Sequence, residues 1–393
     1  MIDIDIKNSR PNADEIEITT IGAGTSAGES IVVHLTNDRW MVVDSCMLDG
    51  EVLPLYYLRK REIDPLKVVY IVCTHWHKDH IQGLSTLLSE CKNARLALPS
   101  VFNQNSVFKA VFTEERSKYS PIAKELGACL DILDSRTDEV LRRPKYLNAD
   151  KEVCSYTING IGVVVNSLSP SDVMKEKYDK MLANSTLQQM ADNDMDTNMC
   201  SVVINIFVDD ERLNIMLGAD LECNRSDEKA LGCSGCCKAN SAIGWCNIII
   251  DSEKYKNHHI YHYLKTSHHS SINGYCPSMM DNRIKKDKTI ITTTLFENNA
   301  DVRLPQDDML SQYLSKCDNY YITSDRPKPK RIKDGKSDIE NQRHKTVESI
   351  KVETPQCGII TTRYDVTSGK MISHELFGSA RSVDSELISA YRI

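Results

Sequence analysis

THWHKDH, the sequence of residues 74–80, follows directly on KVVYIVC at residues 67–73. The β-branched run predicts a buried strand, so the histidines begin where that strand ends and a turn can point them into one cavity. Histidine nitrogen and aspartate oxygen are ligands that zinc and similar divalent ions take. Because only 11 histidines occur among 393 residues, chance is a poor explanation for three of them beside an aspartate in one loop. The stretch predicts a metal site.

The spacing of the four donors allows two ions. His75 and His77 alternate with Trp76 and can face a first ion, while Asp79 and His80 face a second. Zinc is the expected metal, as one or two ions, with manganese as the alternative.

Strands and helices alternate on both sides of this loop. Residues 30–35 and 40–43 are short apolar runs separated by a polar turn, which predicts a hairpin. Residues 199–207 and 213–217 predict a second hairpin. Interleaved strands and helices favour a layered α/β or α+β architecture.

The domain organisation follows from the absence of a dividing linker. We expect a single domain over residues 1–393, with insertions near residues 102–150 and 224–256. Residues 351–377 predict a C-terminal hairpin that turns at Thr367-Ser368-Gly369.

The composition is that of a globular protein that does not coat nucleic acid. Hydrophobic residues make up 41% and charged residues 26%, and the formal net charge is −7, whereas unspecific phosphate binding favours a basic surface. No stretch approaches the roughly 20 apolar residues that cross a bilayer. The acidic, polar start MIDIDIKNSRPNADEIEITT is neither a secretory nor a transit signal. We therefore expect no membrane segment and a cytoplasmic location.

The 14 cysteines fit free thiols in a reducing compartment. The one dense group consists of Cys233, Cys236 and Cys237, with Cys223 and Cys246 nearby. Two interpretations stay open. The thiols are reduced and solvent-accessible in an insertion, or they form a structural zinc clip, since thiolates at short spacing suit tetrahedral zinc.

Four segments resemble motifs of the metallo-β-lactamase superfamily. THWHKDH, with Gly83 after it, resembles the HxHxDH signature. Asp44 in MVVDSC resembles the buried aspartate that supports the metal ligands from behind, and Asp220 in LGAD resembles the aspartate that bridges both metals. LKTSHHSS, at residues 264–271, resembles the LKVPHHGS motif of one branch. That branch is the hydrolase domain of the competence DNA-uptake protein ComEC and its stand-alone relatives.

The resemblance extends from about residue 16 to residue 377 and implies a four-layer αββα sandwich, an α/β (α+β) fold. It implies Asp79 and His269 as catalytic groups and the following metal ligands: His75, His77, Asp79, His80, Asp220 and His268. The spacing leaves open which histidine of the adjacent pair binds metal. Ser169, before Pro170, stands where this branch often has a histidine. We therefore expect Ser169 near the site but not as a ligand, and a first metal site that lacks one protein donor.

The resemblance implies a hydrolase in which bound metal lowers the pKa of water toward about 7. The branch points to phosphodiesters, including nucleic acids and nucleotides. The basic loop Arg326–Lys336 is a candidate for contact with a phosphate backbone, and its alternative role is that of a solvated loop. Two other hypotheses stay open: hydrolysis of a lactone, thioester, β-lactam or other ester in the same pocket, and a degenerate, non-catalytic subunit that binds a partner protein.

Overall fold

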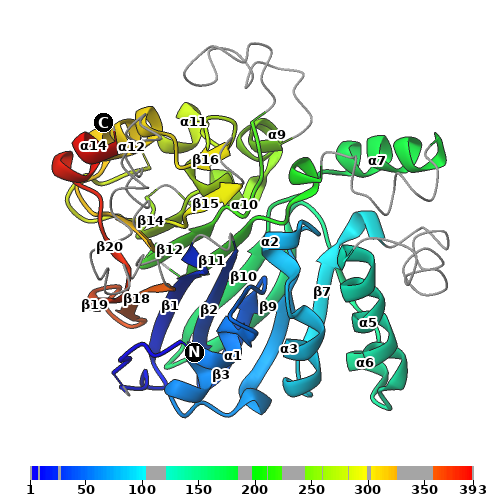
Figure 1. The fold of residues 1–393 in the computed structure, drawn as a ribbon. Helices are drawn as coiled ribbons and strands as arrows, with labels where there is room; N and C mark the ends of the chain where they lie inside the picture. The colour runs from blue at the N-terminus through cyan, green and yellow to red at the C-terminus, as the bar shows by residue number, and fades with distance from the viewer. Residues whose placement is uncertain are drawn as a thin grey trace, which may run out of the picture.

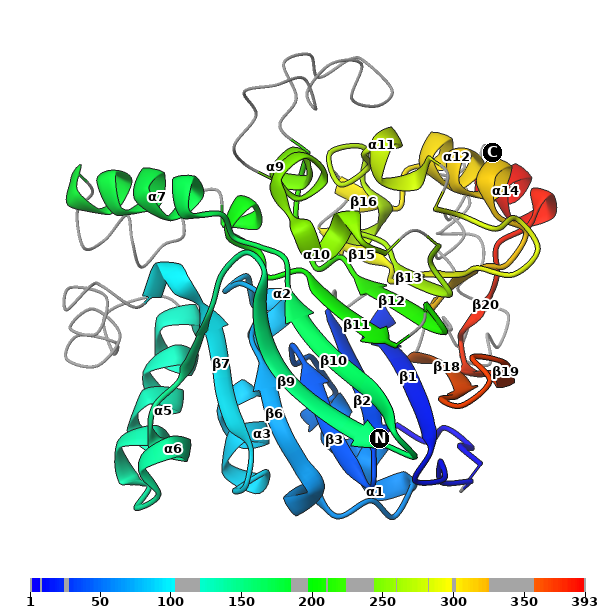
Figure 2. The same cartoon turned by 180° about the vertical axis from the view of Figure 1, so that it is seen from behind.

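The computed structural model describes residues 2–7, 9–24, 28–102, 121–184, 197–209, 211–223, 244–258, 260–281, 283–298, 302–324 and 357–391. In these residues the chain forms two large sheets of eight strands each (Figure 1). Seen from behind, strands β9, β10 and β11 of the second sheet lie in front of β1, β2 and β3 of the first (Figure 2). The predicted layered α/β architecture is confirmed.

The first sheet has the order β19-β18-β1-β2-β3-β6-β7-β8. Its strands are β1 (Glu15–Gly22), β2 (Glu29–Thr36), β3 (Arg39–Val43), β6 (Val68–Val72), β7 (Arg95–Pro99), β8 (Lys145–Leu147), β18 (Gly358–Asp365) and β19 (Met371–Gly378). β2 and β3 form the first predicted hairpin, and β18 and β19 are the antiparallel pair predicted at the C-terminal end. From β3 to β8 the neighbouring strands are parallel.

The second sheet has the order β20-β17-β14-β13-β12-β11-β10-β9. Its strands are β9 (Lys151–Ile158), β10 (Ile161–Ser167), β11 (Ile204–Val208), β12 (Leu213–Leu217), β13 (Tyr263–Lys265), β14 (Ile290–Thr293), β17 (Tyr320–Ile322) and β20 (Arg381–Ser382). β11 and β12 confirm the second predicted hairpin. β12, β13, β14 and β17 are parallel neighbours, so the loops that follow them leave from one edge of the sheet.

The remaining elements are helices, short turns of helix and two small hairpins. The α-helices are α1 (Leu53–Lys60), α2 (Lys78–Ile81), α3 (Leu84–Glu90), α5 (Pro121–Ser135), α6 (Glu139–Arg142), α7 (Asp172–Asn184), α9 (Gly244–Asp251), α10 (Glu253–Lys256), α11 (Pro277–Met280), α12 (Asp307–Lys316) and α14 (Ser385–Tyr391). The 3₁₀ turns are η2 (Pro65–Lys67), η3 (Ser100–Phe102), η5 (Asn198–Cys200) and η6 (His268–Ser270). The hairpins pair β4 (Met47–Leu48) with β5 (Glu51–Val52), and β15 (Phe296–Asn298) with β16 (Val302–Leu304).

Three layers of apolar side chains hold the four layers of backbone together. Alternate residues of a strand point to opposite faces, as β2 shows. Ile31 and Val33 belong to the core between the two sheets, whereas Val32 belongs to the core on the outer face of the first sheet, together with residues of α1, α3 and α5. On the far side, Met216 and Leu264 of the second sheet pack against α9, α11, α12 and α14. This helix–sheet–sheet–helix order is the predicted αββα sandwich.

Both regions expected to be insertions contribute to the layers. α5 buries Leu126 against α3, and β8 is the edge strand of the first sheet. α9 buries Trp245 completely in the second helical layer. Cys223 and Cys246 are likewise buried, with their Sγ atoms 3.7 Å apart, so the interpretation of these two as solvent-accessible thiols is wrong. Cys233, Cys236 and Cys237 lie outside the described residues, and the single-domain organisation stays a prediction.

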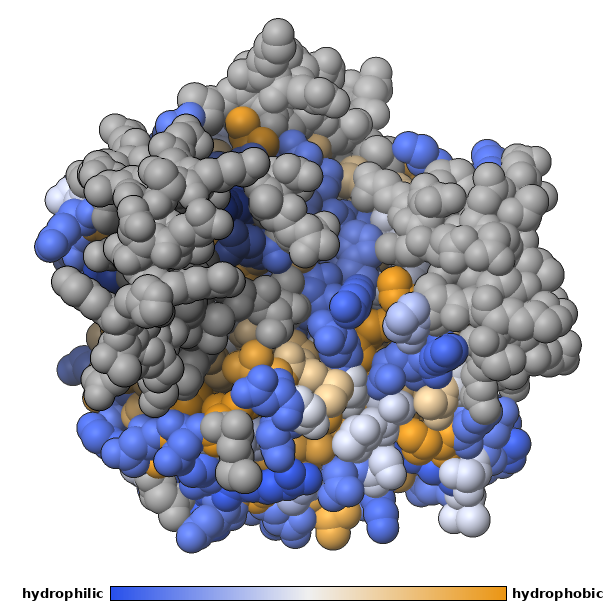
Figure 3. Space-filling model, viewed as in Figure 1, coloured by the Kyte–Doolittle hydropathy of each residue, from blue (hydrophilic) through white to orange (hydrophobic). Residues whose placement is uncertain are grey.

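The face of the molecule seen in Figure 3 is mixed in character where it is coloured. Figure 3 shows hydrophilic side chains interspersed with smaller apolar groups on one face. No helix in the described ranges combines the length and the apolar character needed to cross a membrane.

Candidate metal centre

The donors predicted from the sequence, except His268, meet where strands of both sheets end. His75 and His77 follow β6, and Asp79 and His80 lie in α2 directly afterwards. The backbone of this loop is fixed by the bond from Ser45 N to the His80 carbonyl, at 2.8 Å.

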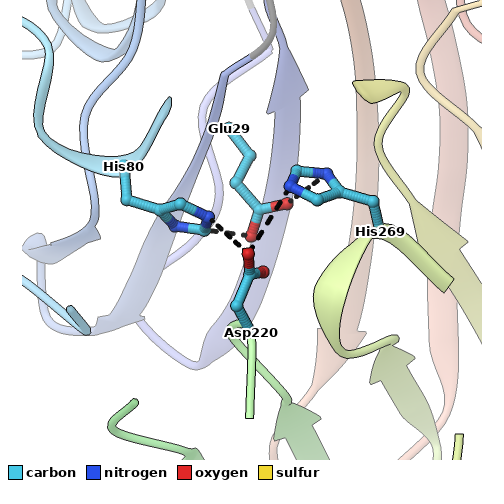
Figure 4. A group of neighbouring side chains, drawn as sticks. All are labelled: Glu29, His80, Asp220 and His269. Carbon is cyan, nitrogen blue, oxygen red and sulfur yellow. Dashed lines mark ion pairs between the residues drawn. The ribbon is translucent and has the colours of Figure 1, made fainter. Parts of the chain in front are cut away.

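The second sheet contributes its donors from two neighbouring strands. Asp220 follows β12 and His269 follows β13, and these strands are parallel neighbours. A Cβ atom at Gly218 would lie only 2.3 Å from Ser267 Oγ, so the close approach of the two loops requires glycine before Asp220. Figure 4 shows His80, Asp220 and His269 converging with the carboxylate of Glu29.

One group of donor atoms centres on His80. The ligand atoms of Glu29, His80, Asp220 and His269 lie within 4.8 Å of one another, and all four residues are buried. His80 Nε2 is 3.3 Å from Asp220 Oδ2, and His269 Nε2 is 3.7 Å from the same oxygen. Asp79 joins this group, since its Oδ2 lies 3.2 Å from His269 Nε2 and 3.5 Å from His80 Nε2.

A second group consists of His75, His77 and Asp220. His75 Nε2 is 3.8 Å from Asp220 Oδ2, and the rings of the two histidines lie 4.8 Å apart. Asp220 therefore belongs to both groups, and its role as a bridge between two metals stays a prediction.

The donor set fits a divalent cation such as zinc. Ligand atoms about 2.1 Å from a tetrahedral ion lie about 3.4 Å apart, which is close to the spacings between His80, Asp79 and Asp220. Among the described residues, His75 Nε2 and His80 Nε2 are buried without a hydrogen-bond partner. Buried polar atoms are nearly always satisfied, so two orphaned nitrogens beside shared carboxylates fit the binding of a cation.

The electrostatics of the cluster favour a positive charge at its centre. Burial by itself would raise the pKa of Asp79 and of Asp220, but the nearby histidines, first of all His80, hold both values below the usual range. Burial lowers the pKa of His75 well below its usual value, which keeps the ring neutral as a metal ligand must be. Burial would also lower the pKa of His80, but Asp220 and Asp79 outweigh it and raise that pKa.

Asp44 positions two of the histidines by hydrogen bonds, His80 directly and His75 through Thr74. Its Oδ2 accepts hydrogen bonds from His80 Nδ1, at 2.8 Å, and from Thr74 Oγ1, at 2.7 Å. Its Oδ1 accepts one from Thr74 N, at 2.7 Å. Thr74 Oγ1 in turn lies 3.1 Å from His75 Nδ1.

The Ser169 hydroxyl forms hydrogen bonds with the backbone. Its hydroxyl donates to the Ser201 carbonyl, at 2.6 Å, and accepts from Val203 N, at 2.9 Å. The side chain thus ties the end of β10 to the start of β11.

The adjacent histidines of η6 point in different directions. His268, His269 and Ser270 all have left-handed backbone angles, with φ values of 47°, 50° and 57°. Such angles cost energy in residues other than glycine and cluster at functional sites. The structure brings the buried His269 into the first donor group, whereas His268 Nδ1 lies 3.1 Å from Glu222 Oε1 and its side chain is 21% exposed.

Two acidic residues of the site were not assigned a role from the sequence. Glu29 begins β2, and the signal for it was the Gly28-Glu29-Ser30 turn, which resembles the opening turn of the branch. Glu222 follows Asp220 by two residues, and no motif marks it.

A match to a family model agrees with these observations. Residues 23–143 match the family model of the metallo-beta-lactamase superfamily. No curated protein matches the chain. Three similar solved structures show low identity and partial overlap. The metallo-beta-lactamase fold protein YhfI from Bacillus subtilis is 11% identical over 53% of this chain and 64% of its own, with a TM-score of 0.27.

A putative metallo-beta-lactamase from Thermotoga maritima is 11% identical over 53% of this chain and 81% of its own, with a TM-score of 0.29. The metallo-beta-lactamase MIM-1 from Novosphingobium pentaromativorans is 17% identical over 50% of this chain and 56% of its own, with a TM-score of 0.27. The chain thus spans less than two thirds of YhfI and of MIM-1. The histidine loop lies inside the residues that match the family model. Residues 23–143 therefore belong to the metallo-beta-lactamase superfamily, and the layers described above give the chain the fold of that superfamily.

Proposed function

We propose that this protein is a metal-dependent hydrolase that activates water at a centre of one or two divalent ions and cleaves phosphodiesters. The observation that carries the proposal is the convergence of two orphaned, buried imidazole nitrogens, His75 Nε2 and His80 Nε2, on the shared carboxylate of Asp220. A purely structural cluster would pair these nitrogens with hydrogen-bond acceptors inside the protein.

The two donor groups differ in the number of ligands that they offer. Asp79, His80, Asp220 and His269 supply four donors to one position, whereas His75, His77 and Asp220 supply three to the other. Zinc suits this mixture of nitrogen and oxygen ligands, and manganese is the alternative. A bound ion of this class makes water nucleophilic near neutral pH and stabilises negative charge on a substrate oxygen.

Polar side chains flank the centre around His268. His268 is partly exposed, and Glu222 and Asn198 flank it, with Asn198 Nδ2 3.5 Å from His268 Nε2. The carboxylate of Asp79 lies deeper, where it can accept a hydrogen bond from the attacking water. These positions fit His268 as a contact to the leaving group, while His269 serves as a metal ligand.

The substrate class rests on the resemblance of LKTSHHSS to the motif of the ComEC branch. Within phosphodiesters, the net charge of −7 favours a nucleotide or a short substrate over a long nucleic acid. The basic loop Arg326–Lys336 lies outside the described residues, so its contact with nucleic acid stays a prediction. We further propose a cytoplasmic location, since the cysteines of the described ranges are free thiols.

The test combines metal loading with a chromogenic substrate. The purified chain, stripped with a chelator and reloaded with zinc or manganese, should hydrolyse bis(p-nitrophenyl) phosphate, and the chelator should abolish turnover. His80→Gln should reduce turnover to background. His262→Gln, which changes a histidine outside the centre, should retain it.

Other outcomes separate the alternatives. Metal-dependent turnover of a lactone, thioester or β-lactam but not of the phosphodiester would replace the substrate class. Bound metal without any turnover would favour the non-catalytic binding subunit, which the three-donor group and the backbone-bound Ser169 also allow.

A further inference from the structure

A buried ion pair lies behind His269. Glu29 is the first residue of β2, and Lys265 is the last residue of β13. The exposed fraction of each side chain is at most 2%. Lys265 Nζ donates a hydrogen bond to Glu29 Oε1. Each charge would be costly to bury alone, so the ion pair fixes the position of the carboxylate between the two sheets.

The second oxygen of the Glu29 carboxylate is connected to His269 by hydrogen bonds through the hydroxyl group of Thr294. Thr294 Oγ1 donates to Glu29 Oε2, at 2.5 Å, and lies 2.7 Å from His269 Nδ1. A carboxylate only accepts, so it takes the single proton of the hydroxyl. The hydroxyl oxygen must therefore accept from Nδ1–H of the imidazole, which leaves Nε2 facing Asp79, within hydrogen-bond distance at 3.2 Å, and Asp220.

The same arrangement occurs on the other side of the centre. Asp44 accepts from Thr74 Oγ1, at 2.7 Å, and this hydroxyl lies 3.1 Å from His75 Nδ1. His80 Nδ1 bonds to Asp44 without an intervening hydroxyl, at 2.8 Å. All three buried histidines thus have Nδ1 committed to a carboxylate, directly or through a threonine, and Nε2 turned to the centre.

The position of Glu29 argues against a role as a direct ligand. Both of its oxygens are engaged, by Lys265 and by Thr294. Its nearest approaches to the histidines are to their Nδ1 atoms, at 3.4 Å for His269 and 3.9 Å for His80. The carboxylate therefore faces the side of each ring that points away from Asp79 and Asp220.

We propose that Lys265, Glu29 and Thr294 form a positioning relay that keeps a proton on His269 Nδ1 and presents Nε2 to the cation. The inference rests on the proposed function only in its second half. The proton on His269 Nδ1 is a property of the metal-free protein and can be measured there.

The first experiment is ¹⁵N NMR of the histidine rings in metal-free protein labelled with ¹⁵N-histidine. The His269 signals are assigned as those missing in His269→Gln. The wild type should show His269 protonated at Nδ1. In Glu29→Gln, Lys265 keeps the amide oxygen and the amide NH₂ faces Thr294, which frees the hydroxyl proton for Nδ1. This variant should shift His269 to the Nε2–H tautomer.

The second experiment measures zinc affinity by competition with a chromophoric chelator. Loss of a hydrogen-bond partner behind a ligand typically costs about 10- to 100-fold in metal affinity. Thr294→Val should show this loss, and Thr294→Ser, which restores the hydroxyl, should recover it. Thr361→Val is the matched control, because Thr361 is equally buried and its hydroxyl bonds only to Thr19 within the described residues.

Each outcome decides a different point. An Nε2–H tautomer in the wild type, or an unchanged tautomer and zinc affinity in both Thr294→Val and Glu29→Gln, would overturn the relay. Glu29 would instead be a direct ligand if Glu29→Gln lost zinc while Thr294→Val kept it. If the relay signature is present but no divalent ion binds the wild type, the proposed function fails and the tautomer assignment stands.

Discussion

Asp220→Asn should remove metal from both donor groups, whereas His77→Gln should remove it from one. Asp220 Oδ2 lies 3.3, 3.7 and 3.8 Å from the Nε2 atoms of His80, His269 and His75. Asparagine keeps the shape of the side chain but removes its charge. His77 belongs to the three-donor group alone.

The expected loss can be estimated from the spacing in the cluster. Two unit charges separated by the 3.3 Å between His80 Nε2 and Asp220 Oδ2 attract by about 5 kcal/mol at an effective dielectric constant of about 20. This energy corresponds to roughly three orders of magnitude or more in an equilibrium constant. A divalent ion bound by Asp220 would lie closer than this, so we expect at least about a thousandfold loss of affinity at both positions.

The assay is zinc content after equilibrium dialysis, together with a chelator-competition titration. The wild type should bind a tight ion and then a weaker one, His77→Gln should lose the weaker ion, and Asp220→Asn should lose both. Thermal unfolding of the metal-free variants checks that they fold. The reasoning fails if Asp220→Asn keeps either ion at wild-type affinity, or if His77→Gln abolishes the tight one.

Three further predictions concern the surroundings of the centre and the core. Asp44→Asn should weaken zinc binding about 10- to 100-fold, since it disturbs the rings of two ligands, and unchanged chelator competition would contradict this. Glu17 is fully buried between the guanidinium groups of Arg61 and Arg363, so Glu17→Gln should lower the free energy of unfolding in urea by about 3–5 kcal/mol and leave zinc content unchanged. Burial lowers the pKa of His374 to about 4. Between this pH and the usual histidine pKa, His374 binds a proton in the unfolded chain but not in the folded protein. Acidification through this pH range therefore destabilises the fold. His374→Gln should reduce that dependence by up to about 1.4 kcal/mol per pH unit, and identical pH slopes of urea unfolding in both proteins would refute the assignment.

The layered fold was predictable because its signals are local. β-branched runs and polar turns marked the β2–β3 and β11–β12 hairpins, and each signal lies within about twenty residues of chain. The β15–β16 hairpin was not predicted, and α9 was taken as part of an insertion. Trp245 shows why: its burial in the second helical layer depends on residues that lie far away in the sequence.

The histidine pair shows the same limit within the site. His268 and His269 are adjacent and chemically identical, so no spacing rule separates them. The left-handed turn at residues 268–270 turns one ring into the centre and the other toward Glu222. That backbone conformation depends on the packing of the β12 and β13 loops, which Gly218 makes close.

The sequence by itself determined the ligand types and the loop that carries most of them, because residues 74–80 are consecutive and follow one strand. Only the tertiary structure decided which side chains form hydrogen bonds to each ligand. Glu29 meets Lys265 and Thr294 across 236 and 265 residues of chain, respectively. Hydrogen bonds act over about 3 Å, and only the packing of one sheet on the other brings such distant side chains within that range.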